Sequence, residues 1–228
     1  RINNEHQADL RLDYNPNERN RILYIPRLTA RFERENSGFF GETTDGQNLI
    51  NQVENSRTGN YNEFDFFNRL LYSHKFNKPG RTVTLRTIYH RGWDNDESDR
   101  TARNTFFEGD TERIEQIDQM TTRERVGNRW EVGVSFTEAL SQKSQLEIEY
   151  EIGNRDNDSD QLVFNVEGGD FETGTMLLDT ALSNTFISDY LTQEFEIGYQ
   201  YATENFKMQT EVQYQDAKLE NGQVFPQT

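Results

Sequence analysis

The sequence contains no cysteine, and only 4 prolines and 3 histidines among its 228 residues. Without cysteine the chain can form no disulfide and perform no thiol chemistry. It has no run of roughly 18 apolar residues, the length that a transmembrane helix needs, so no such helix is predicted. A Gly-x-Ser-x-Gly elbow is also missing, which removes the main sequence signal for hydrolase chemistry. The sequence therefore predicts a protein that is not an enzyme.

Basic residues are scarce, since 24 Lys and Arg against 40 Asp and Glu give a net charge of −16. Nucleic acid binding depends on clustered Lys and Arg, so no nucleic acid partner is expected. Apolar residues are few as well, at 32% of the chain with a mean hydropathy of −0.98. A chain this polar that still has 12% aromatic residues fits an all-β protein with one wet face, or a transmembrane barrel with a wet interior.

The stretch from Glu124 to Ile152 has the clearest pattern in the chain. Large apolar residues occupy every second position from Trp130 to Phe136, and again from Leu146 to Ile152, with polar residues between them. Alternation with a period of two indicates a strand that has one apolar and one polar face. The polar residues 137–143 separate the two runs, so the stretch is predicted to be an antiparallel hairpin.

The same hairpin pattern occurs four times. The four hairpins are predicted at residues 6–34, 61–93, 124–152 and 195–214, with long loops at 35–60, 94–121 and 153–189. Pro26 falls inside a predicted strand and lacks the N–H that a ladder uses, which predicts an edge position or a bulge there. The predicted fold is therefore all-β, an antiparallel up-and-down meander of about eight strands.

The connections between these strands alternate strictly between short turns and long loops. Ordinary hairpin loops have about 2–5 residues, whereas the three long loops are several times longer. Outer-membrane barrels have short turns on the periplasmic side and long loops on the outer side. This alternation favours a barrel, in which the apolar residues face lipid, over a soluble fold in which they face a core.

Several segments resemble the large outer-membrane β-barrel of TonB-dependent-receptor-like proteins of Bacteroidota. The segments are Leu10–Pro16, Leu70–Phe76, Pro79–Thr82, Thr137–Glu147 and Val224–Pro226. They are degenerate turn signatures, but their order and spacing extend over essentially the whole chain. The resemblance implies a ligand-binding receptor or transporter in the outer membrane of a Gram-negative cell envelope.

The resemblance also implies partners and an organisation. Residues 1–228 are expected to be a single section of a large barrel, without the plug domain of a complete receptor. Outer-membrane lipid is the expected environment, and an inner-membrane energising system would act through segments that this chain lacks. A section produced alone has an apolar sheet face and free edges, so it is expected to associate with itself.

Two aromatic pairs are the predicted ligand contacts, Phe39 with Phe40 and Phe106 with Phe107. Both pairs fall in the long loops, where exposed aromatic rings suit stacking on a sugar or a peptide. Small clusters that anchor the loops are an equally good interpretation.

Asp156, Asp158 and Asp160 place carboxylates at alternate positions, as the start of a calcium loop does. The Gly and the distal Glu of an EF-hand are missing, so a solvated acidic loop is the plainer interpretation. Calcium is the only cofactor that the sequence suggests.

Aromatic residues also gather near the short turns: Tyr14, Tyr72, Phe76, Tyr199 and Tyr201. In a barrel they would form a girdle at the membrane interface, and in a soluble fold they would lie at the edge of a core. Two other functions stay open at this point. One is a soluble β-barrel or sandwich that binds a small lipid or carbohydrate, and the other is a surface adhesion or assembly module.

Overall fold

Within residues 1–109 and 111–225, which the computed structural model describes, the chain forms one antiparallel sheet of ten strands. The strands are β1 (Ile2–Asp9), β2 (Leu12–Asn17), β3 (Asn20–Asp45), β4 (Asn48–Lys75), β5 (Thr82–Glu108), β6 (Thr111–Ala139), β7 (Ser144–Glu167), β8 (Thr175–Leu178), β9 (Asn184–Ala202) and β10 (Lys207–Phe225). Eight of them pair in the order β1-β3-β4-β5-β6-β7-β9-β10, with β2 beside β3 and β8 beside β7. The predicted all-β meander of about eight main strands is confirmed.

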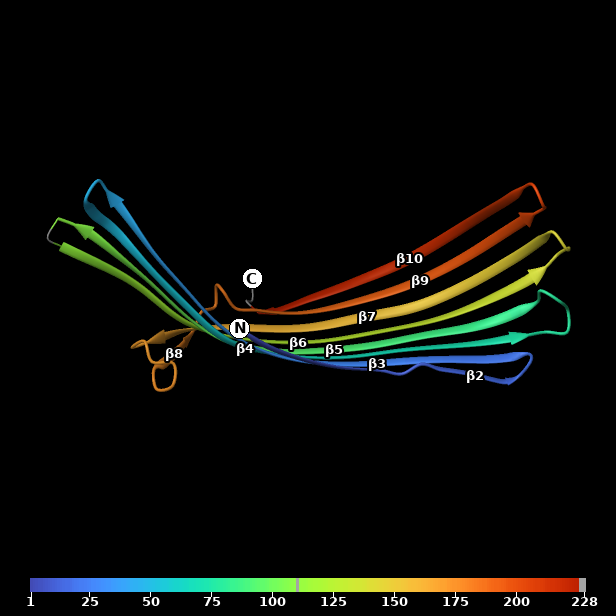
Figure 1. The fold of residues 1–228 in the computed structure, drawn as a ribbon, viewed down its shortest axis with the longest axis horizontal. Helices are drawn as coiled ribbons and strands as arrows, with labels where there is room; N and C mark the ends of the chain where they lie inside the picture. The colour runs from blue at the N-terminus through green and yellow to red at the C-terminus, as the bar shows by residue number, and fades with distance from the viewer. Residues whose placement is uncertain (110, 226–228) are drawn as a thin grey trace.

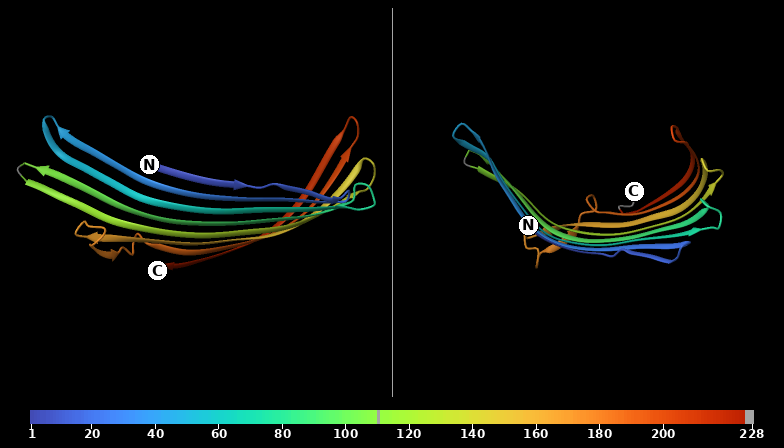
Figure 2. Two further views of the ribbon diagram at one scale, coloured as in Figure 1. Left: turned by 60° about the horizontal axis from the view of Figure 1, so that its bottom comes forward. Right: turned by 45° about the vertical axis from the view of Figure 1, so that its right-hand side comes forward.

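The sheet is a single curved layer whose strands bend together along their length (Figure 1). The strands at the two ends of the chain form its opposite borders, as Figure 2 shows. Strands β1 and β10 do not pair with each other within the described residues. The sheet is therefore open rather than closed into a barrel. The last resembling segment, Val224–Pro226, includes Pro226, which lies outside the described residues.

The prediction of three long loops is wrong. Residues 35–60 belong to β3 and β4 and the turn at Gly46 between them. The two strands pair from Asn20 opposite His74 out to this turn, with one shift of register between Thr43 and Thr44. Residues 94–108 and 111–121 belong to β5 and β6 in the same way. Residues 153–189 include the end of β7, the whole of β8 and the start of β9. Polar residues occupy both faces of these extensions, so no apolar alternation marks them, while backbone pairing still favours a ladder. Alternation alone could not identify them.

The strands consequently have two distinct ends. At one end, called the short-turn end, residues 76–81, 140–143 and 203–206 connect neighbouring strands. At the other, called the hairpin end, β3–β4 and β5–β6 run far outward before they turn (Figure 1). Glycines in the left-handed conformation, Gly46 with φ of 62° and Gly109 with φ of 64°, sit at these two hairpin tips.

Pro26 lies within β3 and pairs with Asn68 on β4, so β3 is not an edge strand. On its other side the neighbouring strand is interrupted at residues 10–11, between β1 and β2. The backbone N–H of Leu10 donates to the Pro26 carbonyl at 3.1 Å. Pro26 has no N–H, so it cannot donate a hydrogen bond back to that strand. The predicted irregularity therefore falls on the partner strand rather than on the strand that contains the proline.

One face of the sheet is apolar, and is called the apolar face. Residues paired across an antiparallel sheet point to the same side. One such row across the sheet consists of Tyr14, Ile22, Tyr72, Leu85, Val134, Tyr150, Phe195 and Tyr214. On β6 the apolar residues of this face extend from Val126 to Phe136, and Asn128 is the one polar residue among them. The residues of the apolar face at the same level on all strands are called the apolar belt.

The opposite face, called the polar face, carries most of the charged side chains, and its side chains are covered to the degree expected on the inner side of the curve. Side chains on the inner side of a curved sheet converge and cover one another, whereas those on the outer side spread apart. On the polar face Asp96 and Ser159 are each only 9% exposed. On the apolar face Val134 is 44% exposed although it lies in mid-sheet.

No second layer covers either face in the part of the chain that the structure describes. The buried apolar side chains there are Val163 and Val166, far fewer than the core of a β-sandwich contains. A soluble sandwich, one of the alternatives from the sequence, is therefore not the fold. The described residues contain no helix that is long and apolar enough to cross a membrane.

Candidate functional site

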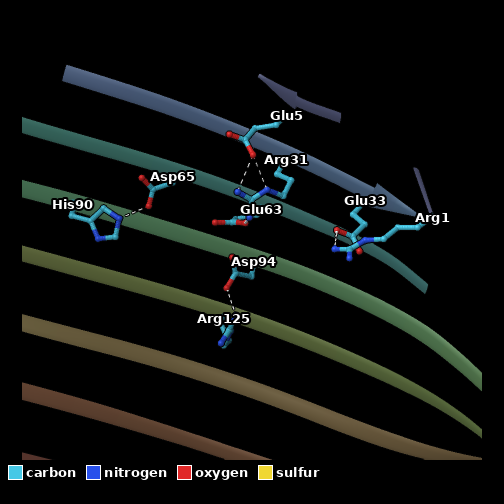
Figure 3. A network of polar contacts seen from close by, with 9 residues as sticks. All are labelled: Arg1, Glu5, Arg31, Glu33, Glu63, Asp65, His90, Asp94 and Arg125. Carbon is cyan, nitrogen blue, oxygen red and sulfur yellow. Dashed lines mark hydrogen bonds and ion pairs between the residues drawn. The ribbon is translucent and has the colours of Figure 1, made fainter. Parts of the chain in front are cut away.

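The polar face holds a set of ion pairs that link neighbouring strands (Figure 3). Arg31 on β3 contacts Glu5 on β1 at 2.9 Å and Glu63 on β4 at 2.7 Å. Arg125 on β6 contacts Asp94 on β5 at 2.6 Å. These pairs are formed because the register places acidic and basic residues opposite each other.

A hollow interrupts this charged surface where two glycines face each other. Gly92 on β5 pairs with Gly127 on β6, so two adjacent positions of the polar face have no side chain. The resulting cavity has a volume of about 550 Å³. A Cβ atom built on Gly92 would lie no nearer than 4.0 Å to any neighbour, which shows how open this point is. The cavity is called the glycine hollow.

Three basic residues form one border of the glycine hollow. The register pairs His90 with Arg129 and Arg129 with Arg155, and these three are called the basic row. Arg129 donates to Glu131 at 2.7 Å through Nε, and the His90 ring contacts Asp65. Arg155 makes no ion pair with any other described residue.

The other sides of the glycine hollow are polar or aromatic. Asn157 and Ser188 continue the row of the two glycines onto β7 and β9. Ser159 and Phe186 line the border nearer the hairpin end, beside the Arg125–Asp94 pair. The hollow therefore combines cationic groups, neutral hydrogen-bonding groups and one aromatic ring. Its lining also includes two aspartates, Asp94, which is paired with Arg125, and Asp158, whose side chain belongs to the apolar face.

The glycine hollow could not be found in the sequence. Its two glycines are separated by 34 intervening residues, and its basic row comes from β5, β6 and β7. Only the register brings them together. The sequence does contain glycine and arginine at polar positions of three strands with alternating polarity. These residues indicate a site only once the register between the strands is known.

The predicted aromatic pairs do not form a common surface. Adjacent residues of a strand point to opposite faces, so Phe39 and Phe40, and likewise Phe106 and Phe107, diverge. On the polar face Phe39 pairs with Asn55 and Phe106 with Asn51, about 13 Å apart along β4. Phe39 is 62% exposed, and Phe106 lies under the Arg113 guanidinium at 4.4 Å. Their role as ligand contacts stays a prediction.

Asp156, Asp158 and Asp160 lie in β7 rather than in a loop. They share the apolar face, where Asp156 accepts from Asn128 at 2.8 Å and Asp160 from Thr185 at 2.5 Å. Across residues 1–109 and 111–225, no three His, Asp or Glu side chains are grouped to hold a metal ion. Calcium binding stays a prediction, and the strand does not have the loop form on which that prediction was based.

The aromatic residues predicted near the short turns do gather there on the apolar face. Tyr14 and Tyr72 belong to one row through Ile22. Phe76 meets the Phe136 ring with centroids 6.5 Å apart. Just beyond them, Glu138 pairs with Arg81 at 2.6 Å and with Lys78, so a charged cluster follows the aromatic residues at the short-turn end.

Two carboxylates organise the connections around β8 at the hairpin end. The pKa of Asp179 is lowered because the carboxylate accepts hydrogen bonds from the Asn165 side chain and from the backbone N–H groups of Leu182 and Ala181. The pKa of Asp170 is lowered in the same way, chiefly by the Thr173 hydroxyl. These hydrogen bonds favour the ionised form of both groups.

Comparison with known proteins identifies one matching family model. Residues 74–210 match the model described as "Outer membrane protein beta-barrel family", and this segment is more than half of the chain. No curated protein matches the sequence.

Two solved structures show a partial likeness to the chain. One is the ferric citrate transporter FecA in the unliganded form, with 6% identity, a TM-score of 0.35, and coverage of 96% of this chain and 38% of that one. Another is the ferric yersiniabactin uptake receptor FyuA from Yersinia pestis, with 8% identity, a TM-score of 0.24, and coverage of 95% and 45%. The chain spans less than half the length of either structure.

Proposed function

Because the chain belongs to the outer membrane protein β-barrel family, we propose that it forms part of the wall of a larger barrel that binds a ligand and takes it up. The division of the sheet into an apolar and a polar face carries this proposal. A barrel wall has apolar side chains toward lipid and polar side chains toward its interior. We take the apolar face as the outer side of the curve, because its side chains are the more exposed, and the polar face as the inner side.

The dimensions of the apolar belt fit a bilayer. On β6 the belt extends over Val126 to Phe136, which matches the roughly 9–11 residues of a tilted membrane strand. Strands β3 to β6 have 26, 28, 27 and 29 residues, so more than half of each extends past the belt. Outer-membrane barrels have their short turns in the periplasm. The hairpin end therefore faces outward and the glycine hollow lies at the outer border of the belt.

The open sheet favours a section of a large barrel over a complete small one. An eight-stranded barrel closes tightly enough for side chains to fill its interior, whereas here β1 and β10 lie at opposite borders (Figure 2). Further strands beside β1 and β10 would satisfy their free backbone groups, which lipid does not tolerate. We extend the proposal to a receptor of the TonB-dependent type found in Bacteroidota, energised from the inner membrane through segments beyond this chain.

The extended hairpins support a second candidate function, a surface adhesion or assembly module. The β3–β4 and β5–β6 hairpins project past the belt and carry exposed aromatic residues such as Phe39 and Phe40. In this alternative the hairpins bind another surface, and no solute passes along the polar face. Solute uptake therefore distinguishes the two functions.

The test uses the full-length protein in its own outer membrane, in a background free of other cysteines. Since this chain has no cysteine, single replacements report on one site at a time. We expect Ser135→Cys on the polar face to react with a water-soluble maleimide and Val134→Cys on the apolar face to be protected. Uptake of radiolabelled nutrients should be higher in cells with the protein than without it, and should fall when a protonophore removes the energy supply. Equal labelling of both positions contradicts the barrel wall, and unchanged uptake contradicts the transport role.

A further inference from the structure

We propose that the glycine hollow binds a small anion that carries carboxylate or phosphate groups, and that the basic row of His90, Arg129 and Arg155 holds it. The proposal rests on the proposed function, because it takes the polar face as the interior wall of the barrel. It adds the chemical class of the ligand and the residues that recognise it.

The charge of the basic row is the first argument. Like charges directly opposite each other destabilise a sheet, yet Arg129 and Arg155 are register partners. The carboxylates facing this region, Asp65, Asp94 and Glu131, contact His90, Arg125 and Arg129 respectively. None of these carboxylates contacts Arg155. The Arg155 guanidinium therefore has no ion-pair partner among them, although the chain as a whole has an excess of acidic residues and a net charge of −16. A bound anion would offset this repulsion.

The space next to the basic row is the second argument. Small-molecule sites in proteins have volumes of about 300–1,000 Å³, and the glycine hollow measures about 550 Å³. Guanidinium groups bind carboxylate and phosphate with two parallel hydrogen bonds, and Arg155 borders this space with no competing carboxylate. Asn157, Ser159 and Ser188 add neutral groups that can bond to further oxygens of the same anion.

The place of the hollow in the sheet is the third argument. Gly92 and Gly127 lie at the hairpin-end border of the apolar belt, level with the step from Val126 to Asn128. A solute that enters from the hairpin end would reach the hollow before it passes the membrane-embedded part of the wall. The hollow is thus positioned to capture a solute at the outer mouth of the barrel.

Binding of citrate and of inorganic phosphate to the purified full-length protein tests the proposal, with glucose as a neutral control. We expect citrate or phosphate to bind in isothermal titration calorimetry and glucose not to bind. Removing one charged hydrogen-bonding partner costs roughly a factor of ten or more in affinity, so Arg155→Gln should weaken binding at least about tenfold. Arg129→Gln should weaken it by a similar factor.

Arg91→Gln is the matched control. It removes the same charge from β5, one residue from Gly92, but on the apolar face, where Arg91 pairs with Phe66 and Asn128. The affinity of this variant for citrate or phosphate should equal that of the unchanged protein. An equal loss in Arg91→Gln and Arg155→Gln would overturn the proposal, because it would show that only the overall charge matters.

A second pair of variants tests the space without changing any charge. Gly92→Phe fills the hollow and should abolish binding, since its Cβ position has room, with the nearest atoms, Asp65 Oδ2 and His90 Cε1, 4.0 Å away. Gly198→Phe places the same ring on the polar face near the short-turn end, where the nearest atom is 3.8 Å from the Cβ position, and should leave binding intact. Resistance of both variants to unfolding in detergent confirms that they are folded.

The outcomes separate this proposal from the proposed function. Binding of citrate alone identifies a polycarboxylate as the ligand class, and binding of phosphate alone identifies a phosphate. If neither anion binds, or if Arg155→Gln and Gly92→Phe bind as well as the unchanged protein, the anion site is overturned. The proposal that the chain forms a barrel wall would be unaffected as long as Ser135→Cys reacts with the water-soluble maleimide and Val134→Cys does not.

Discussion

The belt region of the sheet and its hairpin extensions use the same strands but follow different rules. On β6 the belt alternates strictly from Trp130 to Phe136, whereas the extension from Thr111 to Thr122 mixes polar and apolar residues on both faces. Both regions are paired without a break in register from β5 to β6. The comparison shows that strands can pair in register without alternation, and that alternation reports the environment on each side rather than the strand itself.

A proline in β5 should have the largest effect and should separate the two regions sharply. Thr87→Pro lies in the middle of the belt and Thr101→Pro lies in the extension, on the same face of the same strand. Proline removes the N–H that a carbonyl of the neighbouring strand accepts from, and in lipid no water can replace it. We therefore expect Thr87→Pro to lower the free energy of unfolding by roughly 3 kcal/mol or more. Thr101→Pro should cost about 1 kcal/mol, since water can satisfy its partners. Denaturant unfolding of the full-length protein from lipid vesicles measures both, and equal costs would contradict the placement of the bilayer.

A charge on the apolar face should have the next largest effect. Val132→Arg lies near the middle of the belt, and we expect it to lower the free energy of unfolding in vesicles by about 2–4 kcal/mol. Ile114→Arg is on the same face of β6 but in the extension, where Ile114 is exposed, and it should change stability by less than about 0.5 kcal/mol. A loss of similar size at both positions would mean that the extension is also embedded.

Within the extensions, the segment around β8 differs from the bare hairpin tips because it contains a buried serine. Ser183 is 2% exposed, its Oγ accepts from the Val163 N–H at 2.9 Å and donates to the Asp179 carbonyl at 2.7 Å. Ser183→Ala should therefore destabilise this segment locally by about 1–2 kcal/mol. Faster hydrogen exchange at the Val163 amide, with no change at the Val134 amide in the belt, is the expected result. Unchanged exchange at Val163 would show that the serine contributes nothing.

Acid should produce the smallest effect, again confined to the extensions. Asp179 has a lowered pKa in the folded state against an ordinary value of 3.8, so its contribution is fully present above that value and is lost as the pH falls through the lowered pKa. Amide exchange at Ala181 and Leu182, corrected for its intrinsic pH dependence, should rise below about pH 4. Asp179→Asn keeps an oxygen acceptor but cannot titrate, so its exchange should show no such rise. A rise of the same size in Asp179→Asn would exclude the carboxylate as the cause.

Sequence reasoning succeeded where the strands have one apolar and one polar face. The runs Trp130–Phe136 and Leu146–Ile152 form strands β6 and β7 as predicted, and the short turns fall between the expected residues. It failed for residues 35–60, because a strand with polar residues on both faces leaves no periodic signal. It also missed the glycine hollow, since Gly92, Gly127 and Arg155 become neighbours only through pairing between separate strands.

The predicted ligand contacts show a related difficulty. The sequence pairs Phe39 with Phe40 as ligand contacts because the two are adjacent in an expected loop. Once those residues belong to β3, adjacency places the two rings on opposite sides. A prediction that depends on loop geometry therefore has to be reconsidered whenever the loop proves to be a strand.

Strands β5 and β6 run for 27 and 29 residues without a bulge, from the exposed tip at Gly109 through the glycine hollow to the short turns. A ribbon without a bulge has no local irregularity at which a displacement of its tip could be absorbed. A contact that tilts the tip would therefore shift the backbone further along the ribbon, around Gly92 and Gly127. If the glycine hollow binds a ligand as proposed, a contact at the hairpin tip would in this way change the spacing of the groups that hold it.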